Sequence, residues 1–148
     1  MNLLRTDSEN PDFVSLVRLL DADLAKRDRN EHAFYSQFNK IAAIKHVIVA
    51  YKNEMPVGCG AIKEFTPAAM EVKRMYVVPG LREHGIASQI LTALETWTRE
   101  LGYSTCVLET GKRQPEAIAL YRKKGYDIIP NYGQYIGIDN SVCFGKKL

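Results

Sequence analysis

The segment Arg82-Glu83-His84-Gly85-Ile86-Ala87 follows an apolar run, Met75 to Val78, and opens an amphipathic helix. The run predicts a strand, and the segment then forms the loop and the first helical turn after it. Because the first N–H groups of a helix lack partners within the helix and lie at the positive end of its dipole, such a loop can bind an anion. Gly85 lets a phosphate approach the backbone, the small Ala87 keeps the next turn open, and Arg82 can donate a charge-assisted hydrogen bond. The pattern therefore predicts a nucleotide-like ligand.

A second block lies downstream, at Ala117 to Tyr126, and reads AIALYRKKGY. Arg-x-x-Gly-x-Ala after an apolar strand resembles the acyl-CoA-binding signature of the GNAT N-acetyltransferase superfamily. The second block resembles that family's later helix-to-strand segment, with its Leu-Tyr pair, glycine and aromatic residue. The two motifs occur in the family's order, and the pattern extends over roughly residues 3 to 147. The resemblance implies an acyl-CoA-dependent N-acetyltransferase, a transferase that uses acetyl-CoA as co-substrate.

The order of the expected elements favours an α/β (α+β) fold. Strands are expected at Leu3 to Thr6, Val47 to Tyr51, Val57 to Phe65, Glu71 to Val78, Thr105 to Leu108, Tyr126 to Ile129 and Ser141 to Gly145. Helices are expected from about Pro11 to Ala25, Glu31 to Lys40, Gly85 to Leu101 and Pro115 to Lys124. An antiparallel meander followed by two strand–helix units predicts a mixed, mostly antiparallel central sheet flanked by helices. The resemblance implies a GNAT-like sheet that is splayed at the acyl-CoA site.

Size and composition are typical of one globular domain over residues 1–148, with 46% hydrophobic and 25% charged residues. No apolar run has the length of a membrane span, and the N-terminus lacks the apolar core of a signal peptide. A cytoplasmic location without a membrane partner is therefore expected. The net charge is +3 with both signs mixed along the chain, which differs from the basic stripe of a nucleic-acid-binding domain. No nucleic-acid partner is expected.

The cysteine pattern gives no indication of a metal or disulfide framework. The chain has three cysteines, Cys59, Cys106 and Cys143. They contain no Cys-x-x-Cys pair and have no histidine at ligand spacing, so we expect buried reduced thiols and no metal site. Cys106 has no His or Asn partner in a pattern typical of a cysteine nucleophile.

A base is required for acetyl transfer to an amine, because alkylammonium groups titrate at about pH 10 and must lose a proton before they attack. Glu71, at the start of the strand before the phosphate loop, is the candidate base. It precedes Arg82 by eleven positions, the offset of the base glutamate in histone acetyltransferases of the family. The alternative is a charged residue at a strand start that points to water. Glu109, at the end of the next strand, is the reserve candidate.

Tyr121 is the candidate proton donor. It matches the tyrosine that, in many family members, lies close to the thioester sulfur and protonates the leaving thiolate. Phenol suits this role because it stays protonated at neutral pH. The alternative is an aromatic side chain that packs a helix against the sheet.

The cofactor contacts follow from the resemblance. Pantetheine is a flexible chain with two amides, which can pair with backbone like an added strand. The resemblance places this pairing on the strand and the phosphates on the loop. The predicted cofactor-binding residues are Met75, Tyr76, Val77, Arg82, Glu83, His84, Gly85, Ile86, Ala87 and Gln114. Gln114 stands where many members carry an asparagine that contacts the cofactor.

The acceptor pocket is expected between the second helix and the loop before the final strand. By position in the resembled fold, its lining would come from Glu31, His32, Tyr35, Glu109, Tyr132, Gln134 and Tyr135. This acidic, amide and phenol lining suits a small polar amine. Tyrosine-rich loops also form dimer contacts.

Three hypotheses for the function follow. The leading one is direct attack of a small-molecule amine on the thioester of acetyl-CoA, without a metal or a covalent enzyme intermediate. The second is acetylation of a protein lysine or N-terminus, and the third is a non-catalytic acyl-CoA-binding sensor. A pure sensor needs only the phosphate loop, so the presence of Glu71 and Tyr121 argues against it. The strand Ser141 to Gly145 is a candidate edge for a homodimer.

Overall fold

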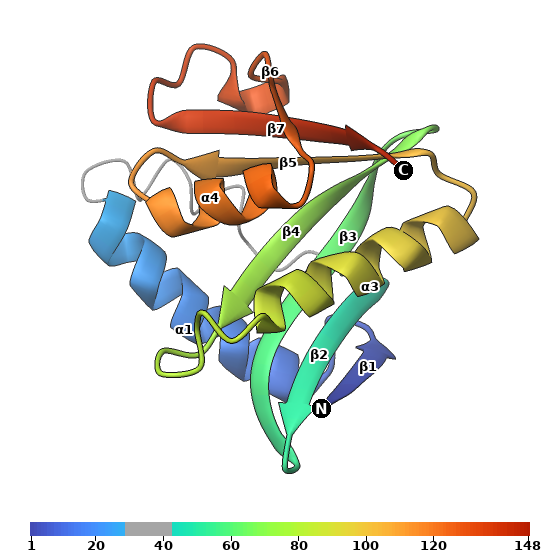
Figure 1. Cartoon of the computed structure of the whole chain (residues 1–148), viewed down its shortest axis with the longest axis vertical. Helices are drawn as coiled ribbons and strands as arrows, with labels where there is room; N and C mark the ends of the chain where they lie inside the picture. Colours follow the sequence, from blue (N-terminus) through green and yellow to red (C-terminus); the bar gives the residue numbers. More distant parts are fainter. Residues whose placement is uncertain (29–42) are drawn as a thin grey trace.

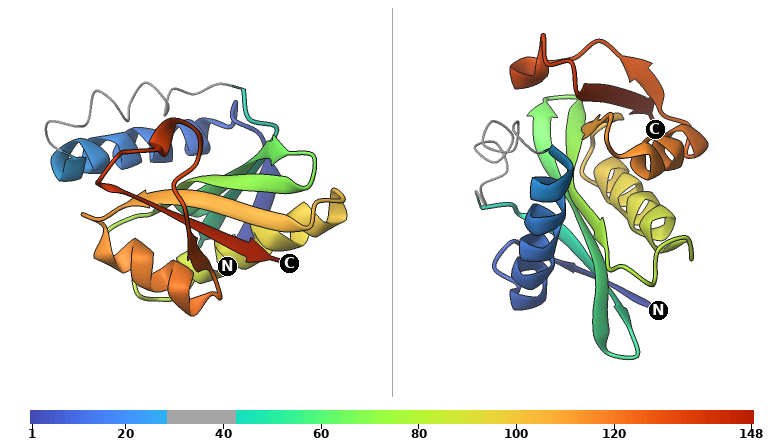
Figure 2. Two further views of the ribbon diagram at one scale, coloured as in Figure 1. Left: turned by 90° about the horizontal axis from the view of Figure 1, so that it is seen from above. Right: turned by 90° about the vertical axis from the view of Figure 1, so that its left-hand side faces the viewer.

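The computed structural model describes residues 1–28 and 43–148, which fold into one sheet with helices on both faces (Figures 1 and 2). In sheet order the strands are β1 (Asn2–Thr6), β2 (His46–Lys52), β3 (Met55–Thr66), β4 (Ala69–Val77), β5 (Thr105–Gly111), β7 (Ser141–Lys147) and β6 (Asp127–Ile129). The described helices are α1 (Pro11–Asp28), α3 (Ile86–Glu100), α4 (Pro115–Lys123) and a 3₁₀ turn at Gly133–Tyr135. Across these ranges no helix has both the length and the apolar character needed to cross a bilayer.

The parallel pair β4–β5 is where the sheet opens. All other neighbouring strands of the described sheet are antiparallel, which confirms the mixed, mostly antiparallel sheet predicted from the sequence. A parallel pair needs a crossover connection, which α3 supplies. The β4–β5 ladder ends where Glu71 pairs with Val107, and beyond this point the two strands diverge (Figure 1). The predicted splay is therefore confirmed.

Side chains of the central strands point alternately to the two faces of the sheet, so the core has two layers. On β2, Val47 and Val49 pack with α1, whereas Ile48 packs on the opposite face in the cluster of α3. Figure 2 shows these two helices on opposite sides of the sheet. β2 thus has buried side chains on both faces, which fixes its register.

Two element ends lie three residues beyond the predicted ones. α1 continues to Asp28, beyond the predicted end at Ala25, because Arg27 pairs with Asp23 one turn earlier at 3.2 Å and stabilises the polar last turn. β5 continues to Gly111, so that Glu109 lies inside the strand rather than at its end. The predicted helix from Glu31 to Lys40 lies outside the described residues.

The C-terminal strand β7 is not an edge, so the prediction that Ser141 to Gly145 forms an edge for a homodimer is wrong. β7 pairs with β5 along its length and with β6 on its other side. The chain passes through α4 and β6 before it returns to insert β7 between β5 and β6. From Cys143 to Gly145 its backbone has a neighbouring strand on both sides. The order of elements in the sequence gave no sign of this insertion.

Gly60 of β3 lies directly beneath α3, and its substitution tests how closely the helix packs. A Cβ at this position would lie 2.6 Å from Met75 Sδ and 2.9 Å from Ile90 Cγ2. We expect Gly60→Ala to lower the free energy of unfolding by about 1–3 kcal/mol through overpacking. Urea unfolding measures this change. Gly145→Ala is the matched control, because its Cβ would make only ordinary contacts, at 3.4 Å or more. Equal losses in the two variants would contradict the packing argument.

Candidate active site

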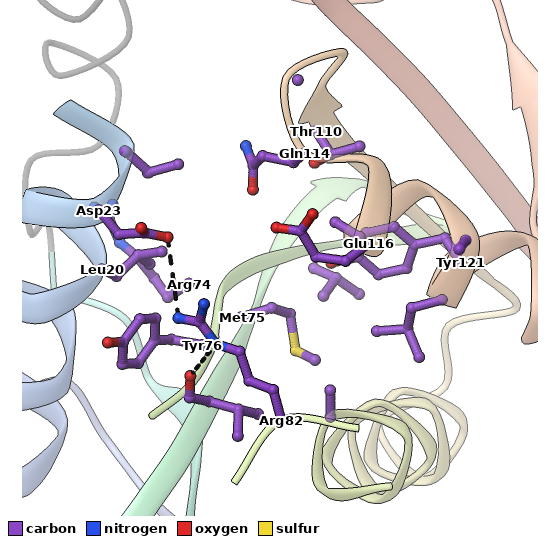
Figure 3. A pocket seen from close by; sticks show the side chains of 18 of the residues that line it. Leu20, Asp23, Arg74, Met75, Tyr76, Arg82, Thr110, Gln114, Glu116 and Tyr121 are labelled. Atoms are coloured by element: carbon purple, nitrogen blue, oxygen red, sulfur yellow. Dashed lines mark hydrogen bonds and ion pairs between the residues drawn. The ribbon is translucent and has the colours of Figure 1, made fainter. Parts of the chain in front are cut away.

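A cleft of about 620 Å³ opens where β4 and β5 separate (Figure 3). Its walls come from α1, β4, the loop between β4 and α3, the end of β5, and α4. Asp23 of α1 and Glu116 of α4 face each other across the cleft, with Arg82 below and Tyr121 at the inner end of α4. Segments that are distant in the sequence thus form one elongated site.

The loop before α3 has the backbone geometry of an anion site. Gly85 is the N-cap residue of α3, with a φ of 79° and no side-chain hydrogen bond to the first turn. Glu83 also has a positive φ, of 67°. The first-turn N–H groups are therefore available to an external acceptor at the positive end of the helix dipole.

Arg82 is held at the end of β4 by three contacts. Its Nε donates to the carbonyl oxygen of Val77 at 2.8 Å, and its guanidinium lies over the ring of Tyr76 at 5.4 Å. Its Nη2 lies 4.0 Å from Asp23 Oδ2. A permanent positive charge is thereby fixed beside the N-terminus of α3, where a phosphate would bind.

A β-bulge changes the direction of β4 within the cleft. The β3–β4 register moves from Cys59–Tyr76 to Ala61–Lys73, and Arg74 has a φ of 60°. Past the bulge, the cleft side of β4 has no ladder with β5. Main-chain groups around Met75 therefore lie along the cleft, where an extended amide-containing arm could pair with them.

Glu71 lies at the last paired position before the splay, with a half-buried carboxylate in the cleft wall. The hydroxyl of Tyr132 donates to Glu71 Oε2 at 2.7 Å, and Lys73 Nζ lies 3.7 Å from Oε1. Burial, together with the nearby charge of Glu71, raises the pKa of Tyr132. The phenol therefore keeps its proton and remains a donor that orients the carboxylate.

Tyr121 is buried, with 6% of its surface exposed, and still lines the cleft. Its ring lies 5.9 Å from the rings of both Tyr126 and Phe144. Burial, and second to it the charge of Glu109, raises the pKa of Tyr121 and also that of Tyr135. Both phenols are thus protonated at neutral pH.

The structure brings together most of the predicted site residues that it describes. The cleft lining includes Glu71, Met75, Tyr76, Val77, Arg82, Glu83, Gly85, Ile86, Ala87, Glu109, Gln114, Tyr121 and Tyr135. Tyr132 lies behind Glu71, while His84 is exposed and outside the lining. Glu31, His32 and Tyr35 lie outside the described residues.

Several cleft residues were not found from the sequence. Arg74 is buried in the wall beside Tyr135, and burial lowers the pKa of its guanidinium. Asp23, Arg27 and Glu116 line the mouth. In the sequence these three residues look like the charged residues of any exposed helix surface. Only the packing of α1 beside the cleft shows that they line it.

All three cysteines are buried and reduced, which confirms the predicted thiols. Burial raises the pKa of Cys59 to about 12, so this thiol is not a nucleophile at neutral pH. Residues 1–28 and 43–148 contain no group of three or more His, Cys, Asp or Glu side chains placed to hold a metal ion.

Comparison with known proteins identifies the family. Residues 13–126 match the model of the acetyltransferase (GNAT) family. An IAA acetyltransferase of Azospirillum brasilense is 42% identical over 101 residues, which is 68% of this chain and 65% of the relative. The chain belongs to the GNAT family of acetyltransferases, whose members are N-acyltransferases and use acetyl-CoA.

Solved structures agree with the fold. A Klebsiella pneumoniae subsp. pneumoniae MGH 78578 protein, itself proposed to be an acyl-CoA N-acyltransferase, superposes with a TM-score of 0.83 at 26% identity, covering 99% of this chain and 97% of that one. A GNAT acetyltransferase from Elizabethkingia anophelis, crystallised with acetyl-CoA bound, has a TM-score of 0.70 at 16% identity, covering 99% and 97%. The second likeness concerns the fold alone.

The N-cap glycine of α3 can be tested for a role in ligand binding. We expect Gly85→Ala to weaken coenzyme A binding about tenfold, because a φ of 79° strains alanine and shifts the N–H groups. Isothermal titration calorimetry measures the Kd. Gly102→Ala is the matched control, since Gly102 has a φ of 91° at the other end of α3 and open space around its Cβ position, as Gly85 has. Both variants should lose about 1 kcal/mol of stability, and equal affinities for coenzyme A would contradict the role of Gly85.

Proposed function

We propose that the protein transfers the acetyl group of acetyl-CoA to the primary amine of a small molecule by direct attack. The observation that carries the proposal is the meeting of three features in one cleft. These are the anion-binding loop at Gly85, the carboxylate of Glu71 at the splay, and the buried phenol of Tyr121. Each feature corresponds to one requirement of acyl transfer from a phosphate-bearing thioester.

The residues present fit acetyl-CoA. The N–H groups of the α3 N-terminus and the Arg82 guanidinium would hold its phosphates. The backbone of Met75 to Val77 would pair with the amides of its arm, and Gln114 lies on the opposite wall. When bound, acetyl-CoA supplies an acetyl group activated as a thioester. The chain's own residues must then accept a proton from the amine and donate a proton to the sulfur.

Glu71 takes the first proton. An ammonium group that enters beside the splay meets this carboxylate, which Tyr132 keeps oriented at 2.7 Å. Transfer of the proton to Glu71 frees the nitrogen lone pair, so that a C–N bond can form as the C–S bond breaks. Glu109 lies in the same cleft from β5 and is the reserve base.

Tyr121 supplies the second proton. Its phenol is protonated because burial raises its pKa, and it can donate a hydrogen bond to the sulfur as negative charge develops there. The electron pair of the C–S bond leaves with the sulfur, which takes the phenol proton and becomes a free thiol. The second proton of the amine nitrogen, released as the amide forms, restores the phenol. Placement of acid and base on different elements, α4 and β4, keeps the two proton transfers separate.

The acceptor is proposed to be a small polar amine. The cleft combines carboxylates, phenols and the amide of Asn140 within about 620 Å³, which suits a metabolite more than a protein surface. The Azospirillum relative is called an IAA acetyltransferase, so IAA belongs among the compounds to test. A cytoplasmic location and a homodimer stay predictions.

The test is thiol release from acetyl-CoA with a panel of amines, amino acids, polyamines, aminoglycosides, peptides and IAA. We expect one class of small amine to give release, and Tyr121→Phe to lower kcat about 100-fold with little change in the Kd of acetyl-CoA. Tyr103→Phe is the matched control, since Tyr103 pairs with Glu64 away from the cleft. Release with peptides alone would favour a protein acceptor, and binding without any release would favour a sensor.

Replacement of the base should produce a pH-dependent defect. Glu71→Gln is expected to lower kcat/KM for the amine about 100-fold near pH 7, with the defect shrinking toward pH 10. The defect shrinks as the pH rises because an amine above its own pKa arrives unprotonated and needs no base. Stopped-time assays across this pH range measure the ratio of kcat/KM between the wild type and Glu71→Gln. Glu109→Gln is assayed in parallel. A defect that stays constant with pH, or is larger in Glu109→Gln, would remove Glu71 from this role.

A further inference from the structure

Arg27 links the two walls of the cleft at its mouth. From the last turn of α1, its guanidinium forms an ion pair and a hydrogen bond with the Glu116 carboxylate in the first turn of α4. Its Nη1 also lies 3.5 Å from the carbonyl oxygen of Arg113, just before α4. Figure 3 shows the Glu116 carboxylate pointing from α4 toward α1. The two helices are therefore tied together across the open side of the cleft.

A second pair of contacts extends this tie to the phosphate loop. Asp23 Oδ2 lies 3.2 Å from Arg27 Nε and 4.0 Å from Arg82 Nη2. The four side chains Glu116, Arg27, Asp23 and Arg82 thus alternate in charge from α4, over α1, to the loop before α3. We call these four residues the clasp. Their side chains are between 24% and 54% exposed, so the pairs are partly shielded from water.

The clasp lies across the path of an extended ligand. A molecule with its phosphates at Gly85 and its reactive end at Tyr121 must pass between α1 and α4, because these helices form the two sides of the cleft. All four clasp residues line this passage. The cleft that they line has a volume of about 620 Å³.

We propose that the clasp closes over the arm of bound acyl-CoA and slows its release, with Arg27 and Glu116 as its opening contact. This inference rests on the proposed function, because it takes the ligand of the cleft to be an acyl-CoA. The arm can leave sideways only when the Arg27–Glu116 pair opens. Loss of either partner therefore accelerates dissociation, and loss of both has no larger effect than loss of one.

The test is a double-mutant cycle on the release of coenzyme A. The release rate is measured by stopped-flow displacement of coenzyme A from the full chain. Arg27→Gln and Glu116→Gln are each expected to raise the release rate about three- to tenfold, and the double variant should match the singles. In the wild type, release should accelerate with added salt, because the pair is partly exposed, while the double variant should show a weaker dependence. A purely structural tie would change unfolding but not release.

Glu100→Gln is the matched control. It breaks another Arg–Glu pair, with Arg5 at 2.7 Å, whose partners lie outside the cleft lining. Its release rate should equal that of the wild type. Unchanged release in the clasp variants, additive effects, or faster association with unchanged release would overturn the proposal. If the wild type bound no coenzyme A at all, the proposed function itself would fail, whereas normal binding with variant-independent release would remove the clasp alone.

Discussion

The early end of the parallel β4–β5 ladder is the constraint on which the site depends. Backbone N–H and C=O groups need partners, and a strand that leaves its neighbour exposes a row of them. Here the ladder stops at Glu71, and one exposed carbonyl, that of Val77, accepts a hydrogen bond from Arg82. The bulge at Arg74 turns β4 further from β5. Separation of two strands therefore creates the cleft, places a carboxylate at its apex and positions Arg82 in the loop before α3.

The parts of the site that could be predicted from sequence are those encoded by local pattern. An apolar strand, a loop with Gly85 and a periodic helix specify a turn with the backbone geometry of an anion site. The block that contains Tyr121 is likewise contiguous, and the structure places it in the same cleft. The order of strands and helices was enough to predict the mixed sheet, because a meander followed by strand–helix units has few packing solutions.

The parts that could not be predicted depend on contacts between distant segments. Arg27 and Glu116 are 89 positions apart, and each has the sequence signature of a solvated helix face. The insertion of β7 between β5 and β6 is a feature of the strand order, and no local sequence pattern indicates it. Arg74 adopts a positive φ that few arginines have, and no neighbouring glycine or turn motif indicates it. These features are set by packing, not by propensity.

Burial keeps the phenols of the cleft protonated. The hydroxyls of Tyr121, Tyr132 and Tyr135 lie among apolar and acidic neighbours, and burial raises the pKa of each. Ionising any of them near Glu71 or Glu109 would place two negative charges close together in a region of low dielectric constant. The phenols therefore keep their protons throughout the neutral range, which fits the proposed role of Tyr121 as the acid and of Glu71 as the base. A surface cluster of the same residues would lack this separation, because water would return each pKa toward its ordinary value.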